Sequence, residues 1–197
     1  MPSRSASSTW SRPGSLRREP VIERSRDRGY AETVKPLSPA QIRESFVNAS
    51  QGEVDRVPMP GLHEVIWGDR EYLGWRDQQA HQRGYLVFWD DETPVGIVLR
   101  ASDFPLKPGI SAMCSLCRVT QPSDQVTLFS APKAGQAGRD GNSVGTYICD
   151  DLACPHMIRV LPPPHPMQIP RDQLLAQRSE NLLARVQAFS SDVMKPA

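Results

Sequence analysis

The chain has 197 residues, of which 39% are hydrophobic and 19 are proline. This length suits one domain with tails rather than two domains, and no stretch approaches the roughly 20 apolar residues of a membrane span. The net charge is +1, so the whole molecule has no strong field to attract a polyanion. The first residues lack the apolar centre of a secretory signal, and we therefore expect a cytoplasmic protein.

Residues 1–36 are rich in Ser, Arg and Pro and have no sustained periodicity. They carry eight Lys or Arg and four Asp or Glu. Such a segment buries too little apolar surface to offset the entropy of ordering, so the sequence predicts a disordered tail. A basic arm of this kind is able to touch RNA, but it is more often a solvated tail.

The ordered part is expected to begin near Leu37. Ser38 followed by Pro39 is typical of a helix N-terminus. The apolar residues that follow recur at helical spacing, which predicts an amphipathic helix over 39–50 that Gly52 closes; they are Ile42, Phe46 and Val47.

Residues 62–77 hold a group of large apolar side chains in a segment without regular periodicity, namely Trp67, Tyr72, Leu73 and Trp75. The group either packs over a sheet as a satellite cluster of the core or forms an aromatic platform for nucleic-acid bases. A platform needs basic residues between the aromatics, and only two arginines lie near. The core interpretation is therefore favoured.

Two segments, 84–89 and 94–100, are dominated by β-branched and aromatic residues, and four polar residues separate them. This pattern predicts an antiparallel hairpin. Because the apolar runs are nearly continuous rather than alternating, both faces of the hairpin are expected to be covered.

Further elements follow the first cysteine pair. Apolar residues at 126–129 predict a strand, a glycine-rich turn is expected over 135–145, and a return strand follows it. A short helix is expected within 150–159, where Pro155 limits its start. Residues 171–189 predict an amphipathic helix with an apolar stripe of Leu174, Leu175, Leu182, Leu183, Val186 and Phe189.

All four cysteines of the chain lie between residues 114 and 154. Cys114 and Cys117 form a C-x2-C pair, and Cys149 and Cys154 form a C-x4-C pair after 31 intervening residues. Four thiolates match the tetrahedral ligation of closed structural zinc sites. The C-x2-C pair forms a tight turn, or knuckle, and the order of knuckle, hairpin and helix start is the layout of a treble-clef zinc finger. The second pair lies near the N-terminus of the expected helix, whose positive end is expected to favour thiolate there.

Other uses of these cysteines fit less well. An iron–sulfur cluster has the same ligands, but its common spacings differ from these, and disulfides rarely persist in the cytosol. His156 is not needed as a ligand because four thiolates already fill a tetrahedron. A catalytic zinc keeps an open position, so we predict one structural zinc ion held by Cys114, Cys117, Cys149 and Cys154.

The sequence shows no other catalytic constellation. Neither GxGxxG nor GxxxxGK[ST] occurs, so no phosphate-binding loop is indicated. His63, His81 and His165 lie in polar or proline-rich surroundings without a matching nucleophile. These observations favour a binding protein without a small-molecule substrate over an enzyme.

Three stretches resemble one known family. They are the segment from Met113 to Cys117, the segment from Gly138 to Cys154, and Leu73 to Asp77 (LGWRD). Together they are similar to elongation factor G-binding proteins, whose C-terminal treble-clef zinc finger is shared with FusB-type fusidic acid resistance proteins. The resemblance covers about residues 37–190, and the four cysteines match the family's zinc ligands.

The resemblance implies an α+β fold, with a treble-clef finger built onto a small antiparallel sheet and followed by a C-terminal amphipathic helix. Composition and the extent of the resemblance together divide the chain into a tail (1–36), a zinc-finger domain (37–190, zinc site 114–154) and a flexible end (191–197). It also implies a partner, elongation factor G, and thus action at the ribosome. We expect the contact surface at the 135–145 loop and the exposed face of the finger.

The resistance proteins of this family have an N-terminal helical bundle, which this sequence does not show, so drug resistance itself does not follow from the resemblance. The alternative function is a zinc-stabilised protein that binds ribosomal RNA through the tail and the finger. It predicts an affinity that falls steeply with salt.

Overall fold

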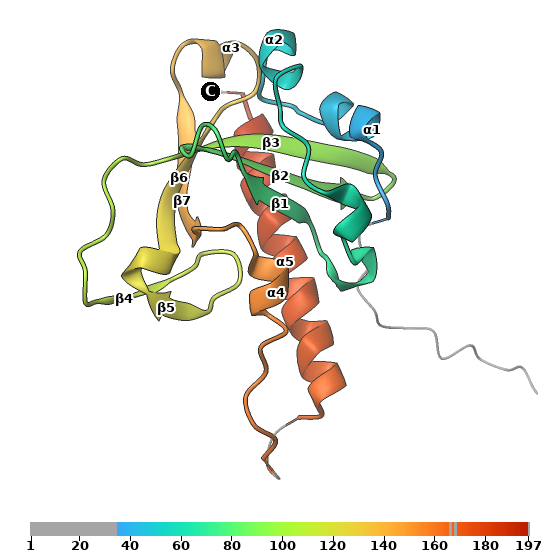
Figure 1. The fold of residues 1–197 in the computed structure, drawn as a ribbon, viewed down its shortest axis with the longest axis vertical. Coiled ribbons are helices and arrows are strands. Elements are labelled where there is room, and N and C mark those ends of the chain that lie inside the picture. Colours follow the sequence, from blue (N-terminus) through green and yellow to red (C-terminus); the bar gives the residue numbers. More distant parts are fainter. Residues whose placement is uncertain (1–34, 166, 168, 197) are drawn as a thin grey trace, which may run out of the picture.

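The computed structural model describes residues 35–165, 167 and 169–196, so the disorder predicted for 1–36 falls almost wholly outside the described residues. The fold is α+β, as expected. A five-stranded antiparallel sheet (Figure 1) has the order β1–β2–β3–β6–β7; its strands are β1 (Leu73–Arg76), β2 (Arg83–Asp90), β3 (Thr93–Ala101), β6 (Val126–Pro132) and β7 (Ser143–Cys149). A separate two-stranded sheet pairs β4 (Ser111–Met113) with β5 (Thr120–Pro122).

The predicted hairpin is confirmed as β2 and β3, which pair from Arg83 opposite Arg100 to Asp90 opposite Thr93. The connection is tighter than expected, because only two residues lie outside the ladder and Asp91 adopts a positive φ of 51°. Five consecutive residues are buried in each strand, 84–88 and 95–99. Both faces of the hairpin are therefore covered, as its continuous apolar runs predicted.

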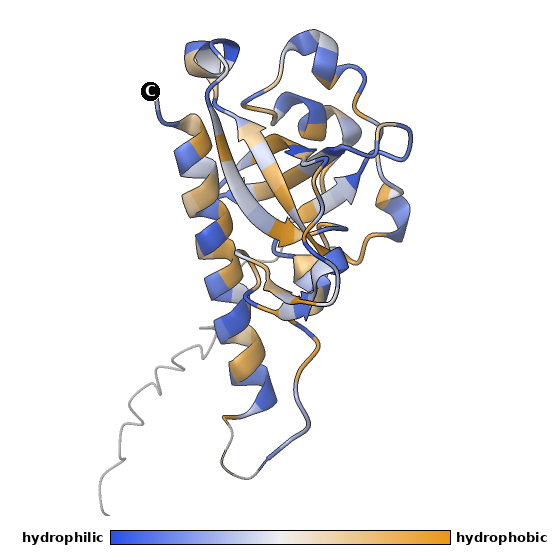
Figure 2. Ribbon diagram, turned by 90° about the vertical axis from the view of Figure 1, so that its left-hand side faces the viewer, coloured by the Kyte–Doolittle hydropathy of each residue, from blue (hydrophilic) through white to orange (hydrophobic). Residues whose placement is uncertain are grey.

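The sheet separates two hydrophobic clusters. On one face, side chains of β2, β3, β6 and β7 pack with the four cysteines and with α5 (Arg171–Met194). On the other face, Leu73, Trp75, Tyr85, Val87 and Val98 pack with the segments of α1 (Pro39–Glu44) and α2 (Gln51–Val54). Figure 2 shows α5 along one side of the sheet and these short helices on the opposite side.

The helix predicted over 39–50 is wrong in its length. Ser38 caps its start with a capping box, as expected, but α1 ends at Glu44. The chain then runs beside β3, where the Gly96 N–H donates to Ser45 O (2.8 Å) and the Val47 N–H donates to Gly96 O (3.0 Å). Gly52, expected to close the helix, lies inside α2.

The reason for this early end is the open edge of β3. Pairing between β3 and β6 is confined to Arg100–Ser130 and Ala101–Phe129, so the first half of β3 needs other hydrogen-bond partners. Residues 45–48 supply them, and Gly96 lets them approach, since a Cβ there would lie 2.5 Å from Ser45 Oγ. A longer helix would leave these backbone groups without partners.

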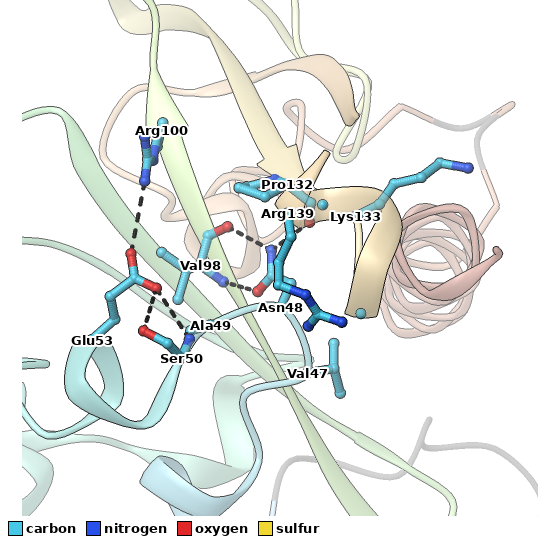
Figure 3. Close-up of a pocket in the computed structure, with 12 residues that line it drawn as sticks. Val47, Asn48, Ala49, Ser50, Glu53, Val98, Arg100, Pro132, Lys133 and Arg139 are labelled. Carbon is cyan, nitrogen blue, oxygen red and sulfur yellow. Dashed lines mark hydrogen bonds and ion pairs between the residues drawn. The ribbon is translucent and has the colours of Figure 1, made fainter. Parts of the chain in front are cut away.

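Asn48 completes this junction with its side chain. Its Oδ1 accepts from the Val98 N–H (2.8 Å), and its Nδ2 donates to Val98 O (3.0 Å) and to Pro132 O (2.9 Å). Figure 3 shows Asn48 between β3 and the end of β6, beside a hollow of about 300 Å³. The amide thus bridges two strands where their backbones diverge.

The C-terminal helix is confirmed and is longer than predicted. It continues past residue 189 to Met194, so residues 191–194 are helical rather than part of the expected flexible end. Val193 is fully buried, and its carbonyl accepts from the Ala134 N–H (2.9 Å).

The 135–145 turn also contains a short helix, α3 (Gly135–Arg139). In the described part of the chain, no helix combines the length and apolarity needed to cross a membrane.

Replacing Asn48 by Ala should lower the free energy of unfolding by about 2–3 kcal/mol, because three hydrogen bonds of roughly 1 kcal/mol each are lost. Urea denaturation measures this change. The control is Asn142→Ala, since the Asn142 side chain is exposed and the change should stay within about 0.5 kcal/mol. Equal stabilities of the two variants would show that the junction does not depend on Asn48.

Candidate metal centre

The four cysteines converge at one buried point. Their sulfur atoms all lie within 4.8 Å of one another, and every cysteine is at least 92% buried. Neighbouring sulfurs are 3.5 Å (Cys114–Cys154), 3.6 Å (Cys117–Cys149) and 3.6 Å (Cys149–Cys154) apart. The structure therefore brings together all four residues that the sequence singled out.

These distances fit a metal ion better than a covalent link. A disulfide joins its sulfurs at about 2.0 Å, whereas thiolates about 2.3 Å from a tetrahedral zinc lie about 3.8 Å apart. The observed separations of 3.5–3.6 Å are close to the second value. The cluster is thus sized for one zinc ion with four sulfur ligands.

The first pair lies in the tight loop between β4 and β5. The Cys114 N–H donates to Val119 O (3.1 Å) and the Arg118 N–H donates to Cys114 O (3.0 Å), which closes the knuckle. Within it, the Cys117 N–H points at Cys114 Sγ (3.4 Å). Arg118 has a positive φ of 60°, a conformation that glycine adopts at much lower cost.

The second pair flanks a loop from the end of β7 to the start of α4 (Cys154–Met157). Asp151 Oδ1 accepts from the Ala153 N–H (2.9 Å), and the Leu152 N–H donates to Cys149 O (2.9 Å). Leu152 is fully buried and has a positive φ of 59°. Cys149 therefore ends a strand and Cys154 begins a helix, as the treble-clef layout requires.

Strand β1 holds this second loop in place through alternate residues, which share one face of a strand. Tyr72 Oη, just before β1, donates to Leu152 O (2.9 Å). Gly74 leaves room for the same carbonyl, since a Cβ there would lie 2.6 Å from it. Arg76 Nη1 donates to Asp150 O (2.9 Å) and pairs with Asp150 Oδ1 (3.0 Å).

The aromatic segment 62–77 is therefore core, as favoured, but its role is larger than expected. It does not lie over the sheet as a separate cluster: its last residues form the edge strand β1. Tyr72 packs with the cysteine cluster, while Trp75 packs on the opposite face. The alternation from Tyr72 to Arg76 is the sequence signal for this strand.

Taken by themselves, the four thiols compete for negative charge. Hydrogen bonds from Cys117, Cys149 and Cys154 lower the pKa of Cys114. Hydrogen bonding to Cys114 and Cys117 raises the pKa of Cys149 and of Cys154, and burial and the charge at Cys114 raise it further. Four thiolates can coexist here only with a cation, and Zn²⁺ supplies two positive charges.

Neighbouring groups complete the polar surroundings of the sulfurs. Gln121 Nε2 donates to Cys149 Sγ (3.2 Å), a contact that stabilises thiolate. Burial raises the pKa of Tyr72 well above its usual range, and the charge of Cys154 raises it further. Tyr72 is therefore neutral and acts as the hydrogen-bond donor to the second loop.

The described histidines lie outside this cluster. The only group of metal-binding side chains found among the described residues consists of the four cysteines. His156 is exposed although it is two residues from Cys154, and His63, His81 and His165 are exposed as well.

The hollow beside Asn48 offers no evident general base either. Its one carboxylate, Glu53, has a lowered pKa because the Ser50 N–H and hydroxyl donate to it. Glu53 is therefore ionised near neutral pH, and Arg100 lies 3.7 Å from it (Figure 3). The side chains of Asn48, Ser50 and Glu53 are thus engaged in hydrogen bonds that hold the fold together.

Comparison with known proteins agrees with this geometry. The family described as FBP C-terminal treble-clef zinc-finger matches residues 41–193. A solved structure, that of the fusidic acid resistance protein FusC, has a TM-score of 0.52 and 18% sequence identity, and the superposition covers 83% of this chain. The chain spans 61% of the length of FusC, and at this identity the likeness shows the fold alone. None of the curated proteins matches the chain.

The family match and the four buried cysteines together support one structural zinc ion. The treble-clef finger expected from the cysteine spacing is thus confirmed, and the α+β sheet on which it is built positions both cysteine pairs.

Replacing Gly74 by Ala should destabilise the zinc loop, because the new Cβ meets Leu152 O at 2.6 Å and overpacking of this kind costs roughly 1–3 kcal/mol. Thermal unfolding and the rate of zinc loss to a chelator measure the effect. Gly145→Ala is the matched control, since it also lies in a strand but its nearest atom would be 3.6 Å away. Equal behaviour of the two variants would refute a role of β1 in holding the loop.

Proposed function

Because the chain belongs to the FBP C-terminal treble-clef zinc-finger family, we propose that it is a non-catalytic binding protein that docks on elongation factor G and modulates its action or release at the ribosome. The carrying observation is the closed, buried four-cysteine cluster. It supports a rigid finger whose activity lies on its surface. The fold shared with a fusidic acid resistance protein is consistent with this class of partner.

We further propose that Cys114, Cys117, Cys149 and Cys154 are the four zinc ligands. Their sulfurs have the spacing of a tetrahedral site, and four thiolates leave no position for water or substrate. In this proposal the zinc ties the β4–β5 knuckle to β7 and α4. It supplies no reactive group.

The docking surface is proposed to be the exposed face of the finger. Met113, next to Cys114, is 52% exposed, and Tyr147 in β7 is 39% exposed. The Ser115 N–H donates to Tyr147 O (2.8 Å), so the two apolar side chains stand on segments that are fixed to each other. Ile110, also half exposed, extends this surface.

The 135–145 loop is a weaker candidate for the contact. It contains α3, and the adjoining Ala134 is hydrogen-bonded to Val193 of α5. Exposed aromatic and Met side chains are typical anchors at protein interfaces, and the finger offers them. The loop presents mainly glycine and polar residues.

Removing one sulfur tests the ligand assignment. Cys149→Ala should abolish stoichiometric zinc binding and unfold residues 112–160, because zinc sites of this kind contribute on the order of 10–16 kcal/mol in small fingers. Metal analysis and circular dichroism measure both effects, with Ser115→Ala as the control. A variant that keeps one zinc and its full fold would overturn the assignment.

Titration calorimetry with purified elongation factor G tests the partner. Binding in the micromolar range is expected, and the pair of changes Met113→Ser and Tyr147→Ser should weaken it at least tenfold, about 1.4 kcal/mol. Ile66→Ser is the control, because Ile66 is 68% exposed but precedes η2 (Trp67–Asp69), which packs with the cluster on the other side of the sheet. No binding at tens of micromolar would contradict the proposal.

A further inference from the structure

Three arginines form a stripe along α5. Arg171, Arg178 and Arg185 follow one another at intervals of seven residues, which on an α-helix turns the side chain by only about 20° per step. Fourteen residues of helix span about 21 Å. Arg118, from the first zinc knuckle, joins the stripe near Arg185. We call these four residues the arginine stripe.

A small hollow lies on the stripe where the helix meets the zinc knuckle. It measures about 180 Å³, and no acidic residue lines it. Its lining comes from only two segments, the knuckle and the middle of α5; the residues are Cys117, Arg118, Val119, Arg178, Asn181 and Arg185. Three guanidinium groups and one amide thus surround a space of molecular size.

The helix arginines are held in position by backbone oxygens. Arg185 Nη1 donates to Leu116 O (2.8 Å), and Arg178 Nη1 donates to Ile158 O and Val160 O (both 3.2 Å). Arg171 Nη1 donates to Pro162 O (3.2 Å). Each contact uses one nitrogen of a guanidinium that carries five N–H donors, so most donors stay available at fixed places.

The positive charge of the stripe is not balanced by neighbouring carboxylates. None of its four arginines forms an ion pair with a described residue, whereas Arg76 pairs with Asp150 and Arg159 pairs with Glu71. Residues 35–197 as a whole carry 16 basic and 18 acidic residues. The stripe is therefore a local cationic feature on a slightly acidic body.

Arg118 adds a second indication. It adopts a positive φ of 60°, where a residue other than glycine is strained, and its side chain makes no hydrogen bond to another described residue. Neither backbone geometry nor internal contacts favour arginine at this position. Arg118 lines the hollow, where its positive charge adds to those of Arg178 and Arg185.

We propose that the arginine stripe binds the phosphate backbone of a nucleic-acid strand, with one phosphate in the hollow. Guanidinium groups bind phosphate oxygens in a two-pronged fashion, and the Asn181 amide is a further donor. The 21 Å length of the stripe favours a chain of regularly spaced charges over a single small anion. This activity is independent of docking on a protein partner.

The arginines of the stripe also have two structural roles. The bonds to backbone oxygens tether residues 158–162 to α5, and the cations offset the formal charge of −2 on a zinc ion with four thiolates. The exposed Arg118 side chain forms no hydrogen bond to another described residue, so it does not take part in the tethering. Variants of Arg118 therefore separate anion binding from tethering.

Fluorescence anisotropy of the full chain with a labelled 12-nucleotide RNA strand tests the proposal, measured over a series of salt concentrations. Each phosphate contact to a single strand contributes about −0.7 to the slope of log K against log[salt]. Arg118→Gln should make the slope shallower by about 0.7, and the double change Arg178→Gln with Arg185→Gln by about 1.4. Metal analysis of each variant checks that zinc is retained.

One control keeps the positive charge of the stripe, and the other removes the same charge from a different part of the surface. Arg178→Lys with Arg185→Lys should keep the slope, and Arg43→Gln with Arg56→Gln, which removes equal charge from the side of α1 and α2, should leave it unchanged. A DNA strand of the same sequence shows whether the sugar matters. Equal slopes for Arg118→Gln, the wild type and the Arg43–Arg56 control would overturn the proposal, as would equally strong competition by a polyglutamate chain of the same charge.

Discussion

The structure depends on four buried thiols that cannot all carry charge without a cation. Cys114 and Cys117 come from a loop between the two strands of a short ladder, and Cys149 and Cys154 flank a loop that contains a strained, buried Leu152. The main sheet reaches this centre through β1, whose face contacts the second loop. Helix α5 covers the same cluster with Leu182, Val186 and Phe189. In the proposed ligand assignment, one zinc ion joins these parts at a single point and compensates the charge of the four thiolates.

Local signals made the hairpin, the cysteine cluster and the long helix predictable. β2 and β3 are recognisable as strands because five consecutive buried positions in each, 84–88 and 95–99, are apolar, aromatic or glycine. The cysteine spacing defines a knuckle without reference to the rest of the chain. The helix over 39–50 failed because its end is set by the open edge of β3, about fifty residues away. The role of Gly74 depends on the carbonyl of Leu152, a contact across the sheet that sequence spacing does not reveal. The seven-residue interval of the α5 arginines was visible in the sequence, but its link to Arg118 required the fold.

Two surfaces of the finger thus have different chemistry. Met113 and Tyr147 offer apolar area of the kind that protein interfaces use, while Arg118 opens onto a cationic hollow shared with α5. Both are fixed by the same knuckle, so a single metal ion sets the geometry of each. If both proposals hold, these two faces let one finger contact a protein partner and a nucleic-acid strand.

The central claim is that zinc fixes the finger to the sheet and to α5. Hydrogen-exchange mass spectrometry of the full chain, with zinc bound and after removal by a chelator, tests it most directly. We expect zinc removal to abolish protection over residues 112–122 and 149–158 and to lower it in the middle of α5, while the β2–β3 hairpin keeps more of its protection. Unchanged protection of both cysteine loops after complete zinc removal would show that zinc does not fix the finger.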